Sequence, residues 1–148
     1  DILGMVAAQG LDPIGEGDCV FLYTGHGDSW SNETWPTLSS EERAAVRAHF
    51  TSGEPGYGIS ACEYFAEQKI IMTGGDTSAN DAQPFGEKGN GYAVPCHTDI
   101  QTRHGIWNLE NLDFQPLLDA GVSEFLFAWA PLRIVGATGS PGNPVVMW

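Results

Sequence analysis

The sequence predicts an α/β fold, in which helices pack on a sheet. Short apolar runs of strand length alternate along the chain with segments whose apolar residues have helical spacing, and this alternation is typical of α/β units. The chain has 148 residues, of which 42% are hydrophobic, so it is long enough to bury a core. We therefore expect a single domain over residues 1–148.

The first expected elements are a helix, a strand and a loop. Apolar residues in the stretch 2–6 have helical spacing, and Gly10 is placed to end that helix in a left-handed conformation. The apolar run 19–23 is continuous, which is typical of a strand covered on both faces. The glycine-containing stretch 24–27 follows this strand, and we expect a flexible loop there.

Two helices and a second strand are expected next. Ser39 and Glu42 form a capping-box pattern at the start of a helix over 41–50, in which apolar residues recur at i and i+4. The segment 61–69 predicts another helix. It leads into the apolar run 70–72, which predicts a buried strand.

The segment 74–91 consists almost entirely of turn-forming residues. It is longer than a routine connection, which indicates either a functional loop or a mobile linker. After it, the sequence predicts a strand at 106–109, a short helix at 114–120 that Asp113 caps and Gly121 ends, a strand at 125–130 and a last strand in the tail.

The charge of the chain excludes two classes of partner. Nineteen acidic and six basic residues give a formal net charge of -13, so a nucleic-acid backbone or an anionic membrane surface repels the chain. No apolar run approaches the roughly 20 residues that span a bilayer, and the first residues lack the basic start of a signal peptide. We expect a soluble protein.

The cysteines suggest a reducing environment. Cys19, Cys62 and Cys96 are odd in number and lack CxxC spacing, which argues against a disulfide framework and against a structural zinc ribbon. Nothing near Cys96 indicates a lowered thiol pKa, so we expect a buried and inert cysteine there. These observations predict a cytoplasmic protein.

The stretch CHTDIQTRHGIWNLENL contains the residues best suited to chemistry. In a strand that starts at Ile106, the period of two places Asn108 and Glu110 on one face and Trp107 and Leu109 on the other. A glutamate on an inward polar face needs a cation or hydrogen-bond donors. His97 is a chemically suitable neighbour of that glutamate for a shared metal.

Plainer interpretations of these residues remain open at this point. His97 can be a hydrogen-bonded loop residue and Glu110 a partner of Arg103, while His104 is expected on the surface. Core packing accounts for most of the tryptophans. Trp30 is the exception, because it follows a polar loop after a buried strand, where an aromatic side chain can line a substrate pocket.

Five sequence blocks occur in order along the chain: GDCVFLYTG, PGYG, GGDT, CHTDIQTRHGIWNLENL and PLRIVGATGSP. Together, from about Ile2 to Pro144, they resemble the cyclase family of metal-dependent hydrolases, which includes bacterial kynurenine formamidase and isatin hydrolase. The resemblance implies a swivelling β/β/α fold, with a mixed sheet and packed helices, that assembles as a homodimer or homotetramer.

The resemblance also assigns roles to two residues. His97 and Glu110 match the late histidine and glutamate that face the metal centre of this family, so both are expected to bind zinc or manganese or to position the attacking water. The reaction that the resemblance implies is hydrolysis of an amide, lactam or ester carbonyl in a small cyclic or aromatic substrate.

The chain departs from the family pattern at its start. The principal metal motif of the family, HxGTHxDxPxH, lies N-terminal to the five blocks and is not found in these 148 residues, which begin at Asp1 within an expected helix. Two protein ligands are one fewer than an open catalytic zinc site normally has. We therefore expect a cyclase-like domain that is incomplete at the N-terminus and inactive alone, with a non-catalytic binding protein or a structural fragment as alternatives.

Overall fold

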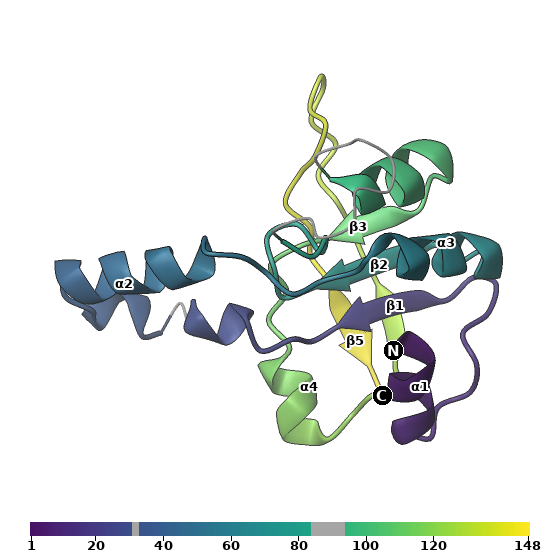
Figure 1. Cartoon of the computed structure of the whole chain (residues 1–148), viewed down its shortest axis with the longest axis horizontal. Helices are drawn as coiled ribbons and strands as arrows, with labels where there is room; N and C mark the ends of the chain where they lie inside the picture. The colour runs from purple at the N-terminus through teal and green to yellow at the C-terminus, as the bar shows by residue number, and fades with distance from the viewer. Residues whose placement is uncertain (31–32, 84–93) are drawn as a thin grey trace. The chain divides into compact units, whose positions relative to one another are not determined.

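The computed structural model describes residues 1–30, 33–83 and 94–148 (Figure 1). The chain divides into two compact units, of which the larger is Ile14–Phe114 and the smaller combines Asp1–Pro13 with Gln115–Trp148. Each unit contains its own sheet. The single domain expected over residues 1–148 stays a prediction.

The larger unit is built on a three-stranded parallel sheet in the order β1-β2-β3. The central strand is buried along its whole length, as a strand with neighbours on both sides should be. Each expected strand exists, although the second begins at Met72 instead of Ile70, and Ile71 is 53% exposed. The strands are β1 (Cys19–Leu22), β2 (Met72–Gly75) and β3 (Trp107–Leu109).

Two expectations about strand burial are wrong. The first strand is only half-buried, because β1 has a neighbour on one side alone in the described sheet. Trp107 is 59% exposed, whereas Leu109 on the same face of β3 is 8% exposed. Periodicity identifies which residues share a face, but not how far the layer that covers this face extends along the strand.

Both helices expected in the larger unit are present, although the second begins at Ile59 instead of Ala61, and the π-helix over residues 97–103 was not predicted from the sequence. Ser39 and Glu42 form the capping box, with the Ser39 Oγ accepting from the Glu42 N–H at 3.2 Å and Glu42 Oε2 accepting from the Ser39 N–H at 2.8 Å. The helices are α2 (Ser40–Phe50), α3 (Ile59–Gln68), the 3-10 turns η1 (Gly27–Ser29) and η2 (Trp35–Thr37), and the π-helix η3 (His97–Arg103).

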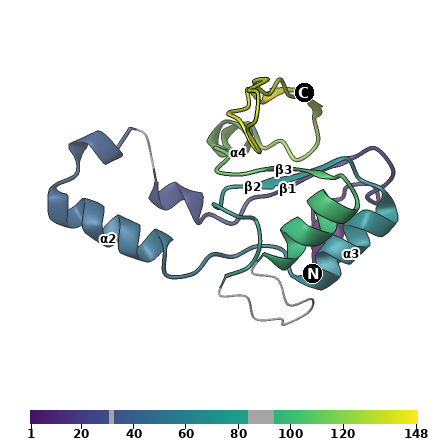
Figure 2. The same cartoon turned by 90° about the horizontal axis from the view of Figure 1, so that it is seen from above.

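The core of this unit lies where α3, η3 and the sheet meet. Helix α3 and η3 lie side by side on one face of the sheet (Figure 2). Phe65 of α3 and Ile100 of η3 are at most 1% exposed, and Met72 and Ile106 of the adjoining strand segments are also buried. This packing places the start of η3, and therefore His97, beside the polar face of β3.

Glycines end both helices of the smaller unit. Gly10 and Gly121 have φ values of 68° and 65°, which glycine adopts without the steric cost that a Cβ brings. The elements of this unit are α1 (Ile2–Ala8), α4 (Gln115–Ala120) and the antiparallel pair β4 (Leu126–Ala128) and β5 (Val145–Met147).

The loop at residues 24–27, expected to be flexible, is held by a buried carboxylate. Asp76 is 3% exposed and accepts hydrogen bonds from the N–H and hydroxyl of Thr24, at 3.0 and 2.8 Å, and from the N–H of Gly27 at 3.1 Å. The loop expected over 74–91 is shorter in the structure, because β2 includes Gly75, and the residues directly after β2 are mostly buried. Residues 84–93 lie outside the described residues.

One disulfide is present, although the odd number and the spacing of the cysteines argued against a disulfide framework. Cys62 and Cys96 form a disulfide across 34 residues, which leaves Cys19 as the free cysteine. The odd count is compatible with one disulfide and one thiol, so it does not establish a reducing environment, and the cytoplasmic location stays a prediction. Within the described residues, no helix is both long and apolar enough to cross a membrane.

Candidate functional site

The candidate site is centred on His97, whose ring lies between two carboxylates. Its Nδ1 is 2.5 Å from Asp81 Oδ2 and its Nε2 is 2.9 Å from Glu110 Oε1. The side chain of Asp81 is 2% exposed, that of His97 22% and that of Glu110 35%. The site therefore has a buried end at Asp81 and an open end at Glu110.

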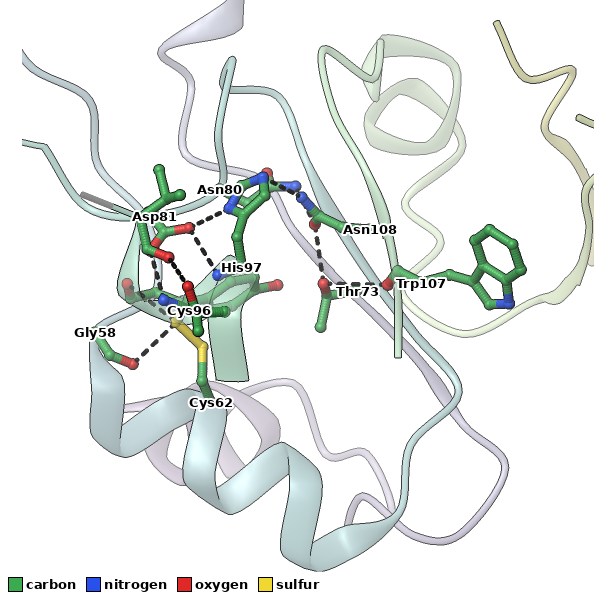
Figure 3. The surroundings of a disulfide bond; sticks show 12 residues. Gly58, Cys62, Thr73, Asn80, Asp81, Cys96, His97, Trp107 and Asn108 are labelled. Carbon is green, nitrogen blue, oxygen red and sulfur yellow. Dashed lines mark hydrogen bonds and ion pairs between the residues drawn. A yellow bond between two sulfur atoms is a disulfide. The ribbon is translucent and has the colours of Figure 1, made fainter. Parts of the chain in front are cut away.

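Asp81 binds both the backbone at the start of the π-helix and the imidazole ring of His97. Its Oδ1 accepts from the Cys96 N–H at 2.7 Å, and its Oδ2 lies 3.3 Å from the His97 N–H as well as next to the ring (Figure 3). A carboxylate on one ring nitrogen fixes the tautomer and the orientation of a histidine whose other nitrogen does chemistry.

Asn108 connects the site to the buried interior of the sheet. Its Oδ1 accepts from the Thr73 hydroxyl at 3.0 Å and from Asn80 Nδ2 at 2.7 Å. Those two donors fix the amide so that its Nδ2 points the other way, donating to Glu110 Oε1 at 3.1 Å and lying 3.4 Å from His97 Nε2. The orientation of Glu110 is thus set by a chain of donors that starts in the core.

The two carboxylates stabilise the charged form of the imidazole. The hydrogen bond to Asp81, and next that to Glu110, raise the pKa of His97 to about 9, against the opposing effect of burial. At neutral pH both ring nitrogens then carry protons and donate. Loss of the Nε2 proton turns this atom into an acceptor that faces Glu110 and Asn108.

The structure brings together two of the three residues singled out from the sequence. His97 and Glu110 are hydrogen-bonded, and Arg103, the alternative partner of Glu110, pairs with Asp99 at 2.6 Å instead. Trp30 is 43% exposed and stacks on Trp35 with ring centroids 4.4 Å apart. No described contact joins Trp30 to His97 or Glu110, so its place in a substrate pocket stays a prediction.

Sequence reasoning missed Asp81 and Asn80. Asn80 has a φ of 57° and donates from Nδ2 to the Leu109 carbonyl at 2.8 Å, in addition to its contact with Asn108. Both residues lie in the loop just after β2, in the segment that the sequence marked as a candidate functional loop. A polar loop directly after a buried strand was the available signal, but it does not identify which side chains face the site.

The described residues alone do not fit a complete metal site. His97 Nε2 and Glu110 Oε1 are nitrogen and oxygen donors of the kind that zinc and manganese accept, and they lie on the open side of the ring. In the described ranges, however, no group of three or more His, Cys, Asp and Glu side chains is arranged to hold an ion. A metal ion bound by His97 and Glu110 would need further ligands from outside the described residues.

Three solved structures share the fold. A novel cyclase has a TM-score of 0.75 and 25% identity over 99% of this chain, and an isatin hydrolase bound to the product analogue thioisatinate has a TM-score of 0.68 and 26% identity over 98%. Isatin hydrolase A from Ralstonia solanacearum, at 22% identity and a TM-score of 0.66 over 98%, supports the fold alone. The chain spans about half of the length of these proteins: 44% of the novel cyclase and 50% of each isatin hydrolase.

The family comparison agrees with these structures. A search of curated proteins found no match. The family model described as "Putative cyclase" matches residues 1–82, which is more than half of the 148 residues. Together with the shared α/β fold, this match shows that the chain belongs to the cyclase family.

Proposed function

We propose that His97 and Glu110 form part of the active site of a metal-dependent hydrolase. The proposed reaction is hydrolysis of an amide, lactam or ester carbonyl in a small cyclic or aromatic molecule. The observation that carries this proposal is the position of the His97 ring, which Asp81 holds at Nδ1 while Nε2 faces Glu110. Similarity to an isatin hydrolase supports the lactam class.

The residues of this chain have distinct tasks in the proposed reaction. Glu110 is the more exposed carboxylate, and Asn108 fixes its Oε1 by a hydrogen bond, so Glu110 is placed to accept a proton from water. Asp81 keeps the Nδ1 proton of His97 in place, so that His97 meets the substrate side with Nε2.

Zinc or manganese, held by His97 and Glu110 with ligands from outside the described residues, would supply a Lewis acid and a water of lowered pKa. Because the ring must lose its Nε2 proton before it can bind a cation, binding of Zn²⁺ should release protons and should strengthen as the pH rises toward 9. This proton release can be measured by calorimetry in two buffers of different ionisation enthalpy.

The decisive experiment is the substitution Glu110→Gln in the complete protein. The amide keeps the size of the side chain but accepts no proton, so hydrolysis of isatin or of an aryl formamide should fall about a hundredfold or more. Glu67→Gln is the matched control, because Glu67 is an exposed glutamate on α3. Turnover by Glu110→Gln that equals the control would remove Glu110 from the mechanism.

A second candidate function is a binding protein that keeps the fold without catalysis. The observation in its favour is that the described residues supply two converging donors and not three. Such a protein would bind isatin or a related lactam without turnover, even with Zn²⁺ or Mn²⁺ added. Metal-dependent hydrolysis by the complete protein would exclude it.

A further inference from the structure

One cysteine of the disulfide, Cys96, directly precedes His97 in the sequence. Cys62 belongs to α3, Cys96 is the residue directly before η3, and their Cα atoms are 5.7 Å apart (Figure 3). The two residues are 0% and 1% exposed. The sulfur–sulfur bond therefore joins the N-cap residue of the helix that carries His97 directly to α3.

Asp81 is anchored to the same region by backbone contacts. The Tyr57 N–H donates to the Asn80 carbonyl at 2.6 Å, and the Ala82 N–H donates to the Tyr57 carbonyl at 3.2 Å, so the two bonds bracket Asp81 in a parallel bridge. Tyr57 immediately precedes Gly58, the N-cap of α3. The acceptor in the site is thus fixed to the start of the helix that carries Cys62.

The disulfide and the bridge converge on one hydrogen-bond cluster. The donors to Asp81 come from Cys96, through its N–H, and from His97, through its N–H and ring Nδ1. The disulfide fixes the donor segment and the Tyr57 bridge fixes the acceptor segment. Because both are tied to α3, the ring of His97 has one favoured position relative to Glu110, the residue directly after β3.

We propose that the Cys62–Cys96 disulfide is a positioning element of the His97 site. It holds the start of η3 against α3, so that Asp81 reaches both the backbone and the ring of His97. The inference depends on the proposed function only for the task of His97 in hydrolysis. The position of the ring itself is a property of the folded chain and can be tested without substrate.

Loss of the disulfide should leave the fold in place and release the ring. Reduction by a dithiol transfers two electrons and two protons to the sulfur–sulfur bond, which becomes two thiols, while the dithiol closes into its own disulfide. The Cys96 Sγ lies 3.6 Å from the Tyr57 carbonyl and 3.5 Å from the Gly58 carbonyl, so the new thiol has acceptors inside the protein.

The test is nuclear magnetic resonance of the full chain without metal. A proton shared between His97 Nδ1 and Asp81 gives a resonance far downfield, which reports the ring position in folded molecules alone. We would compare the oxidised protein, dithiothreitol-reduced protein and Cys62→Ala, with Cys19→Ala as the matched control because Cys19 is the free cysteine. The amide resonances of β2 report the fold in every sample.

The downfield resonance should be present in the oxidised protein and in Cys19→Ala. It should be lost in Cys62→Ala and in the reduced protein, while the amide resonances of β2 stay unchanged. Reoxidation of the reduced protein should restore it. An unchanged resonance in folded Cys62→Ala would overturn the proposal. Should this variant fail to fold, the reduced protein decides, and loss of the β2 resonances there as well would show that the disulfide stabilises the whole fold instead. If the resonance behaves as expected but the complete protein hydrolyses no substrate, the proposed function is refuted and the positioning role of the disulfide stands.

Discussion

Glu110 Oε1 lies 2.9 Å from His97 Nε2, although thirteen residues and a change of secondary structure separate them. This contact is the second-largest cause of the raised pKa of His97, after the hydrogen bond to Asp81. Glu110→Gln removes the negative charge and keeps the shape, so the pKa of His97 should fall from about 9 toward its ordinary value but stay above it. Titration of the His97 ring protons by magnetic resonance measures this, and an unchanged pKa would contradict the contact.

Stability should depend on pH through the same histidine. The pKa of His97 is about 9 in the folded protein and about 6.5 in the unfolded chain. The contribution of His97 to the free energy of unfolding is therefore fully present below about pH 6.5 and is lost as the pH rises through 9. The free energy of unfolding of metal-free protein should fall by up to about 1.4 kcal/mol per pH unit in that window. Urea unfolding of the wild type and of His97→Gln isolates this dependence, which the variant should lack.

Gly75 provides the space that Asn80 occupies. A Cβ at this position would clash with Asn80 Oδ1, so Gly75→Ala must displace that amide, whose Nδ2 is one of the two donors that orient Asn108. We expect a loss of about 1–3 kcal/mol in unfolding free energy, because a partly buried polar group loses its partner. Gly139→Ala, where a Cβ meets nothing within 4 Å, is the control and should change stability little.

Asp76 should be the main stabiliser of the 24–27 loop. In Asp76→Asn one of the two acceptor oxygens becomes an amide donor and faces a backbone N–H, so we expect a loss of about 1–3 kcal/mol in the free energy of unfolding. Asp12→Asn changes an exposed aspartate and serves as the control. Equal urea midpoints for the two variants would show that the Asp76 hydrogen bonds contribute little net stability.

Local sequence signals predicted local structure well. The Ser39 capping box, the glycines that end α1 and α4, and the polar face shared by Asn108 and Glu110 all depend on residues within a few positions of one another. Residue chemistry suggested that His97 pairs with Glu110, but only resemblance to a family decided for it, because spacing alone also allowed Arg103 as the partner of Glu110.

The contacts missed from the sequence join distant segments. Asp81 is 16 residues before His97, and Cys62 is 34 residues before Cys96, with no pattern that links either pair. Both contacts require the start of η3 to lie against α3, which is a property of the packed core. The exposure of Trp107 was missed for the same reason, since an alternating pattern says nothing about the extent of the layer above a face.

The three N–H groups that converge on Asp81 restrict which side chain that position tolerates. Both carboxylate oxygens accept, so an asparagine of the same size would turn an amide N–H toward a backbone or ring N–H. Glutamate would carry the same two acceptors on a longer stem into a space where the residue is 1% exposed. Position 81 is therefore constrained by the polarity of its head group as strictly as a position in an apolar core is constrained by volume.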